Sequence, residues 1–180
     1  MKKAFLHRGP VIFLLLLAPF LLNDFSNIYV DSFPVWLSID YLVTKVLPLA
    51  FLGYLLVKKV IIPTDLGLKM PGKVDFVVYT LVLTAGGLLL DQVGWRLLDD
   101  VLPDTQIGSI PFDRASPWFV FDLYVGLALV ALVEEIVFRG LFYTLLRRVI
   151  PSIPVVFILC SLVFGLIHWS LGLAAIASTA

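Results

Sequence analysis

The sequence predicts an all-α protein, a polytopic bundle of about five transmembrane helices that forms one domain over residues 1–180. Of the 180 residues, 61% are hydrophobic and only 14% are charged, and the mean hydropathy is +1.04. A soluble domain usually carries about a quarter charged residues, so the lipid bilayer is the expected solvent. A membrane-spanning helix needs about 20 mostly apolar residues. Five runs qualify: roughly 4–23, 41–57, 74–97, 118–146 and 153–176.

In the first run, VIFLLLLAPFLL follows Lys2, Lys3 and Arg8, and in this respect the N-terminus resembles a signal peptide. The segment after it, NDFSNIYV, lacks the small-residue pattern at which signal peptides are cleaved. We therefore expect an uncleaved first transmembrane helix. Because a proline removes a helical hydrogen bond, prolines are expected to kink the first two helices or mark their ends. They are Pro10, Pro19 and Pro48.

The third run leads into a polar stretch over residues 99–116, rich in Asp, Pro and Gly, which we expect to be an exposed or interfacial loop. The fifth run contains the single cysteine, Cys160, which is interpreted as a small buried hydrophobe. After His168 the chain runs WSLGLAAIASTA and stops without a charged flank or a polar tail. We therefore expect an interrupted sequence.

Basic residues predict the orientation of the bundle, because they favour cytoplasmic loops. Nine of the thirteen fall on one predicted side: Lys2, Lys3, Arg8, Lys58, Lys59, Lys69, Lys73, Arg147 and Arg148. A multi-pass protein of the cell membrane with a cytoplasmic N-terminus is expected. Lys45, near the outer end of the second helix, is expected to extend toward the interface, in the direction of Asp40. Tryptophans near span ends fit interfacial anchors: Trp36, Trp95 and Trp118. The formal net charge is zero, and no nucleic-acid partner is expected.

Ionisable residues interrupt the fourth run, LYVGLALVALVEEIVFRGLFYTLL, at Glu134, Glu135 and Arg139. A charge at the centre of a membrane helix costs a few kcal/mol or more, so such residues are either paired for structure or part of a site. Glu135 and Arg139 are four residues apart, on one helix face and in the favourable order. Glu134 lies about 140° around the helix from Arg139. We expect Arg139 to pair with Glu135, which leaves Glu134 as the candidate general base.

The fifth run carries a second candidate, His168, with Phe164 four residues before it on the same face. The short connection around Pro151 implies that the fourth and fifth helices are antiparallel neighbours. Because Glu134 and His168 are equally far along the chain from position 151, we expect them at the same depth. Each alone has a simpler interpretation, an interhelical clamp for the cluster and a hydrogen-bonded packing residue for the histidine. Together they favour a functional site.

These residues resemble the CAAX protease and bacteriocin-processing family of intramembrane proteases, called the CPBP or Abi family. Its EExxxR motif is matched by Glu134, Glu135 and Arg139, and its FxxxH motif by Phe164 and His168. The resemblance covers residues 118–180, whereas the first three helices match only as apolar spans. The flanking segment EEIVFRGLFYTLLRR is similar to bacterial members, which implies a prokaryotic source.

The resemblance implies a glutamic intramembrane endopeptidase, a hydrolase of membrane-associated protein or peptide substrates, as in CAAX-like or C-terminal tail processing. By this likeness Glu134 activates water, while His168 positions the water or supports the tetrahedral intermediate. Glu135, Arg139 and Phe164 would support the site. No cofactor is expected, although an older view of the family assigns it zinc. A catalytic zinc site needs about three protein ligands, and only one histidine is placed to contribute.

The sequence departs from the family pattern at its third motif, a histidine followed four residues later by Asn or Asp, which is thought to stabilise the oxyanion. The chain ends before the C-terminal helices that carry this motif, so it is either truncated or an incomplete member. An incomplete member would be a non-catalytic membrane scaffold or a bacteriocin-immunity-type protein. A proton carrier is the least favoured reading, because the sequence reveals no discontinuous helix pair and no repeat.

Overall fold

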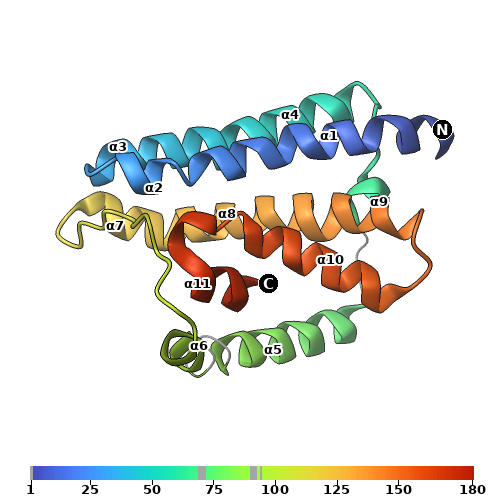
Figure 1. Cartoon of the computed structure of the whole chain (residues 1–180). Helices are drawn as coiled ribbons and strands as arrows, with labels where there is room; N and C mark the ends of the chain where they lie inside the picture. Colours follow the sequence, from blue (N-terminus) through green and yellow to red (C-terminus); the bar gives the residue numbers. More distant parts are fainter. Residues whose placement is uncertain (1, 69–71, 90–92, 94) are drawn as a thin grey trace.

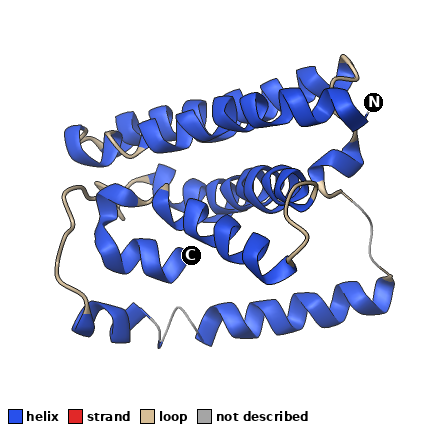
Figure 2. Cartoon of the chain, turned by 45° about the vertical axis from the view of Figure 1, so that its right-hand side comes forward, coloured by secondary structure: helices blue, strands red, loops and turns tan. Residues whose placement is uncertain are grey.

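The computed structural model describes residues 2–68, 72–89, 93 and 95–180. Within this part of the chain every regular element is a helix and no strand occurs (Figure 2). The predicted all-α class is therefore confirmed. Lys69 lies outside the described residues, as does the side chain of Trp95.

Two long antiparallel helices form the first layer of the molecule (Figure 1). One is α1 (Lys2–Asn23), followed by the single turn α2 (Ser26–Tyr29). The other, called here the second helix, comprises α3 (Phe33–Asp40), the π-helical segment η1 (Tyr41–Val46) and α4 (Leu47–Val57). Both helices extend from one end of the molecule to the other (Figure 1).

Prolines end neither of these helices. Pro10 and Pro19 lie inside α1. The second helix begins at Phe33 instead of the predicted residue 41, because Pro34 occupies its first turn, where a proline sacrifices no helical hydrogen bond. Pro48 follows closely on η1, whose wider π turn can separate the proline ring from the carbonyl four residues before it.

A central helix runs without interruption from Pro117 to Arg147, which confirms the helix predicted over 118–146. Ser116 begins it by accepting a hydrogen bond from the N–H of Trp118 at 3.3 Å. Two of its segments, η4 and η5, are π-helical. In chain order the segments are α7 (Pro117–Phe121), η4 (Asp122–Gly126), α8 (Leu127–Glu134), η5 (Glu135–Phe142) and α9 (Tyr143–Arg147).

The helix predicted over 153–176 is broken in the structure. It consists of α10 (Ile153–Leu166), the 3-10 turn η6 (Trp169–Leu171) and α11 (Gly172–Thr179), with a bend of 70° at the break. Gly172 has a φ of 91°, and a side chain there would meet the backbone N of Gln106 at 2.9 Å. Only glycine fits such a position without strain.

The remaining elements lie at the edge of the bundle. The 3-10 turn η2 (Pro63–Leu66) packs on η5 of the central helix. The third predicted helix, 74–97, corresponds to α5 (Lys73–Leu89) and the beginning of α6 (Trp95–Val101). Both views place α5 on the side of the molecule opposite α1 (Figures 1 and 2). Residues 102–116 then return to the central helix without regular structure.

The core lies where α1, α4, α10 and the central helix meet. Phe138 is fully buried at its centre. The rings of Phe13, Phe20 and Phe164 surround it with centroid distances of 6.0, 5.4 and 5.4 Å, all in tilted or edge-on arrangements that aromatic pairs prefer. This packing fixes the central helix between α1 and α10, and with it the residues that follow α8.

Among the described residues, two helices are long and apolar enough to cross a membrane, Arg8–Tyr29 and Phe33–Val57. The bent pair of α10 with η6 and α11 makes a third if it counts as one span. The helical membrane character is supported, whereas the expected count of about five spans is not reached. Exposed apolar side chains cover the outer faces, as a lipid-contacting surface requires. They include Val11, Leu14, Leu15, Leu42, Val46, Leu47, Leu162 and Leu166.

Candidate active site

One cavity contains both residues that the sequence proposed for chemistry. Its volume is about 440 Å³, and its walls come from α1, the second helix, the central helix and the break after α10. Glu134, the last residue of α8, and His168, two residues after α10, both line it. The hairpin between α9 and α10 turns over residues 148–152, where it was predicted. The expected common depth of the two residues agrees with their shared cavity.

The two adjacent glutamates occupy different environments. Glu135 forms an ion pair with Arg139, and their side chains are 52% and 54% exposed at the outer surface of the central helix. This pair was predicted from the four-residue spacing. Glu134 is half-buried and lines the cavity instead. The division of the cluster into one paired and one cavity-facing carboxylate therefore holds in the structure.

His168 lies in the break between α10 and η6, so its expected place within a continuous helix is wrong. Its backbone N–H donates to the carbonyl of Gly165 at 3.0 Å, and its carbonyl accepts from the N–H of Leu171 at 3.1 Å. These turn hydrogen bonds satisfy the backbone where the helix is interrupted. Non-helical backbone at membrane depth is tolerated where it lines a cavity or is buried in protein, and both conditions are met here.

Phe164 connects the two motifs. The guanidinium carbon of Arg139 lies 5.2 Å from the centre of the Phe164 ring, within the range of a cation–π contact. The ring of His168 meets the same phenyl ring edge-on, with centroids 5.7 Å apart. The ion pair on the outside of the central helix is thus linked through one aromatic ring to the histidine that lines the cavity.

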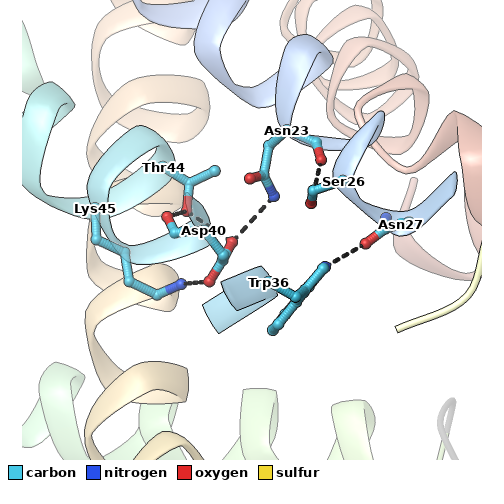
Figure 3. Close-up of polar contacts among 7 residues, drawn as sticks. All are labelled: Asn23, Ser26, Asn27, Trp36, Asp40, Thr44 and Lys45. Carbon is cyan, nitrogen blue, oxygen red and sulfur yellow. Dashed lines mark hydrogen bonds and ion pairs between the residues drawn. The ribbon is translucent and has the colours of Figure 1, made fainter. Parts of the chain in front are cut away.

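A buried polar network holds the segment that follows His168. Ser170 is fully buried, and its N–H donates to the carboxylate of Asp24 at 2.7 Å. Its hydroxyl accepts from the side-chain amide of Asn27 at 2.9 Å. The indole N–H of Trp36 donates to the Asn27 carbonyl oxygen at 2.8 Å (Figure 3). Trp36 is only 6% exposed, so the prediction that it is an interfacial anchor is wrong.

The connection over residues 102–116 closes one end of the site. The N–H groups of Ile107 and Gly108 donate to the Ser170 carbonyl at 3.0 and 2.9 Å, and that of Ser109 donates to the Asn27 carbonyl at 2.8 Å. Much of this segment is exposed, as expected of a loop, but it is docked on the break after His168. Its contribution to the cavity wall consists of Ile110, Phe112 and Arg114.

A second ion pair, between Lys45 and Asp40, forms part of the cavity wall (Figure 3). The other carboxylate oxygen of Asp40 accepts from the side-chain amide of Asn23 at 3.1 Å and from the hydroxyl of Thr44 at 3.0 Å. The expected direction of Lys45, toward Asp40, is therefore confirmed. The expectation that Lys45 extends toward the interface is wrong, because its side chain is only 3% exposed.

The zinc hypothesis requires about three neighbouring protein ligands. Among the residues that the structure describes, no group of three or more His, Cys, Asp and Glu side chains is placed to hold a metal ion. The donor set around His168 therefore does not fit a zinc centre. Cys160 is buried in α10, in agreement with its interpretation as a packing residue.

The polar residues of the first two helices were not predicted to belong to the site, since Lys45 was expected only at the interface, in the direction of Asp40. Those helices were treated as generic apolar spans, yet polar side chains of α1, α2 and the middle of the second helix line the cavity. An ionisable residue within a membrane helix is a functional candidate by default, and this signal was available. The residues concerned are Asn23, Asp24, Asn27, Asp40, Thr44 and Lys45.

Residues 116–180, about a third of the chain, match the family model described as Rce1-like, type II CAAX prenyl endopeptidase Rce1-like. This segment contains the EExxxR and FxxxH motifs, the central helix and the broken helix that follows. The resemblance found in the sequence is therefore confirmed for this part of the chain. No curated protein and no solved structure matches the chain significantly.

Proposed function

We propose that this protein is an intramembrane endopeptidase that hydrolyses peptide bonds of membrane-associated substrates with a water molecule activated by Glu134. The observation that carries the proposal is that Glu134 and His168, from two motifs far apart in sequence, line one cavity. The match of residues 116–180 to a family of prenyl endopeptidases supports the reaction class. By analogy, a lipid-modified or membrane-inserted C-terminal segment is the substrate class to test first.

In the proposed reaction, Glu134 takes a proton from water, and the resulting hydroxide oxygen forms a bond to the scissile carbonyl carbon. The electron pair of the carbonyl double bond moves to its oxygen, which becomes the oxyanion of a tetrahedral intermediate. When the intermediate collapses, the carbonyl re-forms and the C–N bond breaks. The leaving nitrogen takes the proton from Glu134, so that the carboxylate is regenerated.

His168 either positions the attacking water or donates a hydrogen bond to the oxyanion through a ring nitrogen. Its ring rests against Phe164, which limits the directions that it can take. Glu135 and Arg139 support this arrangement from outside the cavity. Glu135 pairs with Arg139, and the Arg139 guanidinium contacts the same Phe164 ring that His168 meets. In the proposal the positioning residues are Glu135, Arg139 and Phe164, and the catalytic residues are Glu134 and His168.

The cavity walls suit a partly apolar substrate. Aromatic side chains from α1, from the 102–116 connection and from α7 line it beside the polar groups: Phe20, Phe112 and Phe119. A site of this kind favours an apolar segment next to the scissile peptide, held in place by a few polar groups. We assign the protein to the cell membrane as a multi-pass protein with a cytoplasmic N-terminus, on the strength of its charge distribution and its candidate spans.

Cleavage of a farnesylated CAAX peptide by the purified chain in liposomes tests this proposal. The rate should fall by about 100-fold or more in Glu134→Gln, the loss that removal of a general base causes. Asp31→Asn provides the control, because Asp31 is exposed and lies outside the Glu134 cavity. Mass spectrometry of the products identifies the cleaved bond. Wild-type rates in Glu134→Gln, in a protein that remains folded, would contradict the proposal.

The alternative is a non-catalytic membrane scaffold or immunity-type protein, in which the charged cluster only joins helices. The ion pair between Glu135 and Arg139 is the observation that favours it. On this alternative Glu134→Gln preserves biological function, while Arg139→Ala impairs folding. Loss of function in folded Glu134→Gln distinguishes the endopeptidase from the scaffold.

A further inference from the structure

The ion pair between Lys45 and Asp40 is buried inside an apolar bundle. Their side chains are 3% and 10% exposed. Each carboxylate oxygen of Asp40 has a partner, since Lys45 binds one and Asn23 with Thr44 binds the other (Figure 3). Lys45 also lies 4.6 Å from the centre of the Tyr41 ring. The ammonium group is therefore held from two sides by residues of its own helix.

Stability alone is a weak explanation of this pair. Removing two charges from water costs several kcal/mol per ion, and buried ion pairs can often be replaced by apolar residues of similar volume without loss of stability. An ionisable residue within a membrane-spanning segment is more often part of a functional site. Lys45 also lies in η1, which begins directly after Asp40, and π-helical segments occur frequently at functional sites.

The pair faces the proposed general base. Lys45, Asp40 and Glu134 line the same cavity, and η1 packs against α8, the segment that ends at Glu134. Among the described residues of the cavity wall the basic side chains are Lys45 and Arg114, and Lys45 comes from the segment that packs against α8. Within its own motif Glu134 has no cation to itself, because Arg139 pairs with Glu135, whereas Lys45 brings a cation to the same cavity from the second helix.

The hydrogen bonds of Lys45 leave donors for the cavity. An ammonium group has three N–H donors, and in the described part of the chain Lys45 uses one of them, on Asp40. The side-chain carbonyl oxygen of Asn23, also in the cavity wall, is buried without a hydrogen-bond partner. The cavity that Glu134 lines is therefore also lined by a hydrogen-bond donor, on Lys45, and by a hydrogen-bond acceptor, on Asn23.

We propose that Lys45, oriented by Asp40, is a positioning residue for the Glu134 site: its ammonium charge attracts the Glu134 carboxylate and keeps it directed into the cavity. This inference rests on the proposed endopeptidase function and extends the site to the second helix, outside the segment that matches the family. Asp40 acts through Lys45, and Asn23 and Thr44 act through Asp40.

Three variants separate this role from a merely structural one in the farnesylated-peptide assay in liposomes. Lys45→Met should lower kcat by about 100-fold with little change in KM, the loss expected when a catalytic group is misplaced. Lys45→Arg should retain more of kcat, because it keeps a cation beside Asp40. The double variant Asp40→Leu with Lys45→Met removes both charges, so the bundle should stay folded in thermal unfolding while kcat remains low.

The outcomes are distinct for the two proposals. If the double variant regains wild-type kcat, the pair is structural and this inference fails, whether or not Lys45→Met alone folds. If Glu134→Gln keeps the wild-type rate, or the wild type does not cleave, the endopeptidase proposal fails first. Arg148→Met is the control for loss of an ion pair, because Arg148 pairs with Asp65 at 2.6 Å outside the cavity and should leave kcat unchanged.

Discussion

At the scale of single residues, the main result concerns two neighbours, Glu134 and Glu135, that meet different surroundings. One chemical group, the side-chain carboxylate, is paired with Arg139 at the bundle surface in one case and lines a cavity in the other. The helix geometry alone predicted this division, because a four-residue spacing favours a pair and a five-residue spacing does not. What the spacing could not predict is the cation that shares the cavity of Glu134, since Lys45 comes from a helix far away in sequence.

Phe164 provides a prediction at this scale. Its ring contacts both Arg139 and His168, so Phe164→Leu keeps an apolar side chain but removes the edge-on contact that limits the His168 ring. The expected result is a fall in kcat on the order of 10-fold, with KM nearly unchanged, since less-fixed catalytic groups react more slowly. Phe157→Leu, on the same helix and 63% exposed, is the matched control and should keep the wild-type rate. Equal rates in both variants would contradict the proposed role of Phe164.

At the scale of elements, the hairpin of α9 and α10 was predictable and the break after α10 was not. Two prolines and a short connection indicate the turn directly in the sequence. The break depends on long-range contacts instead: Ser170 bonds Asp24 and Asn27 from α1 and α2, and the 102–116 connection bonds Ser170. A local apolar pattern contains no information on such partners. The sequence therefore predicted that the helix continues through residues 169–176.

The hydrogen bonds around Ser170 should contribute measurably to the free energy of unfolding of the protein. Asp24→Ala leaves the buried N–H of Ser170 without its acceptor and removes one of the two acceptors of the Asn27 amide, and an unsatisfied buried donor costs about 1–3 kcal/mol. We expect a lower unfolding temperature in detergent for this variant. Asp31→Ala, which changes an exposed carboxylate nearby in sequence, should leave stability nearly unchanged. If both variants unfold at the wild-type temperature, the network does not hold the break.

Helix contacts at η5 give a second prediction at the element scale. A side chain at Gly140 would meet the backbone carbonyl of Leu66 in η2, whereas one at Gly53 in α4 would meet nothing within 4 Å. Gly140→Ala should therefore destabilise the protein by about 1–3 kcal/mol, the range for an overpacked position. Gly53→Ala should be neutral or stabilising, because alanine favours helix more than glycine does. Denaturant unfolding of both variants compares them, and equal stability would argue against the close contact of η2 with η5.

At the scale of the whole molecule, the described helices place the basic connections together. Figure 1 shows the N-terminus, the end of α4 and the α9–α10 connection at one end of the bundle, with α2, α7 and α6 at the other. The charge pattern of the sequence predicted this grouping. It also predicted about five spans, and here composition was insufficient: only two helices, or three with the bent pair, meet the criterion within the described residues.

The orientation is testable with a membrane-impermeant maleimide, because Cys160 is the single cysteine and is buried. In a Cys160→Ala background, Asp104→Cys should react in intact cells, since Asp104 is exposed and lies beside α2, which Figure 1 shows at the end opposite the N-terminus. Lys58→Cys should react only after permeabilisation, because the cytoplasmic side carries the basic connections. The reverse labelling pattern would show that the N-terminus is outside.

The central claim is that Glu134 and His168 act as one unit in the cavity that they share. A double-mutant cycle of kcat/KM on the farnesylated peptide, with Glu134→Gln, His168→Ala and their combination, tests it most directly. Residues that act on the same step are strongly non-additive. The double variant should be no slower than the slower single variant. Losses that multiply, as they do for independent residues, or a Glu134→Gln variant with the wild-type kcat/KM, would contradict it.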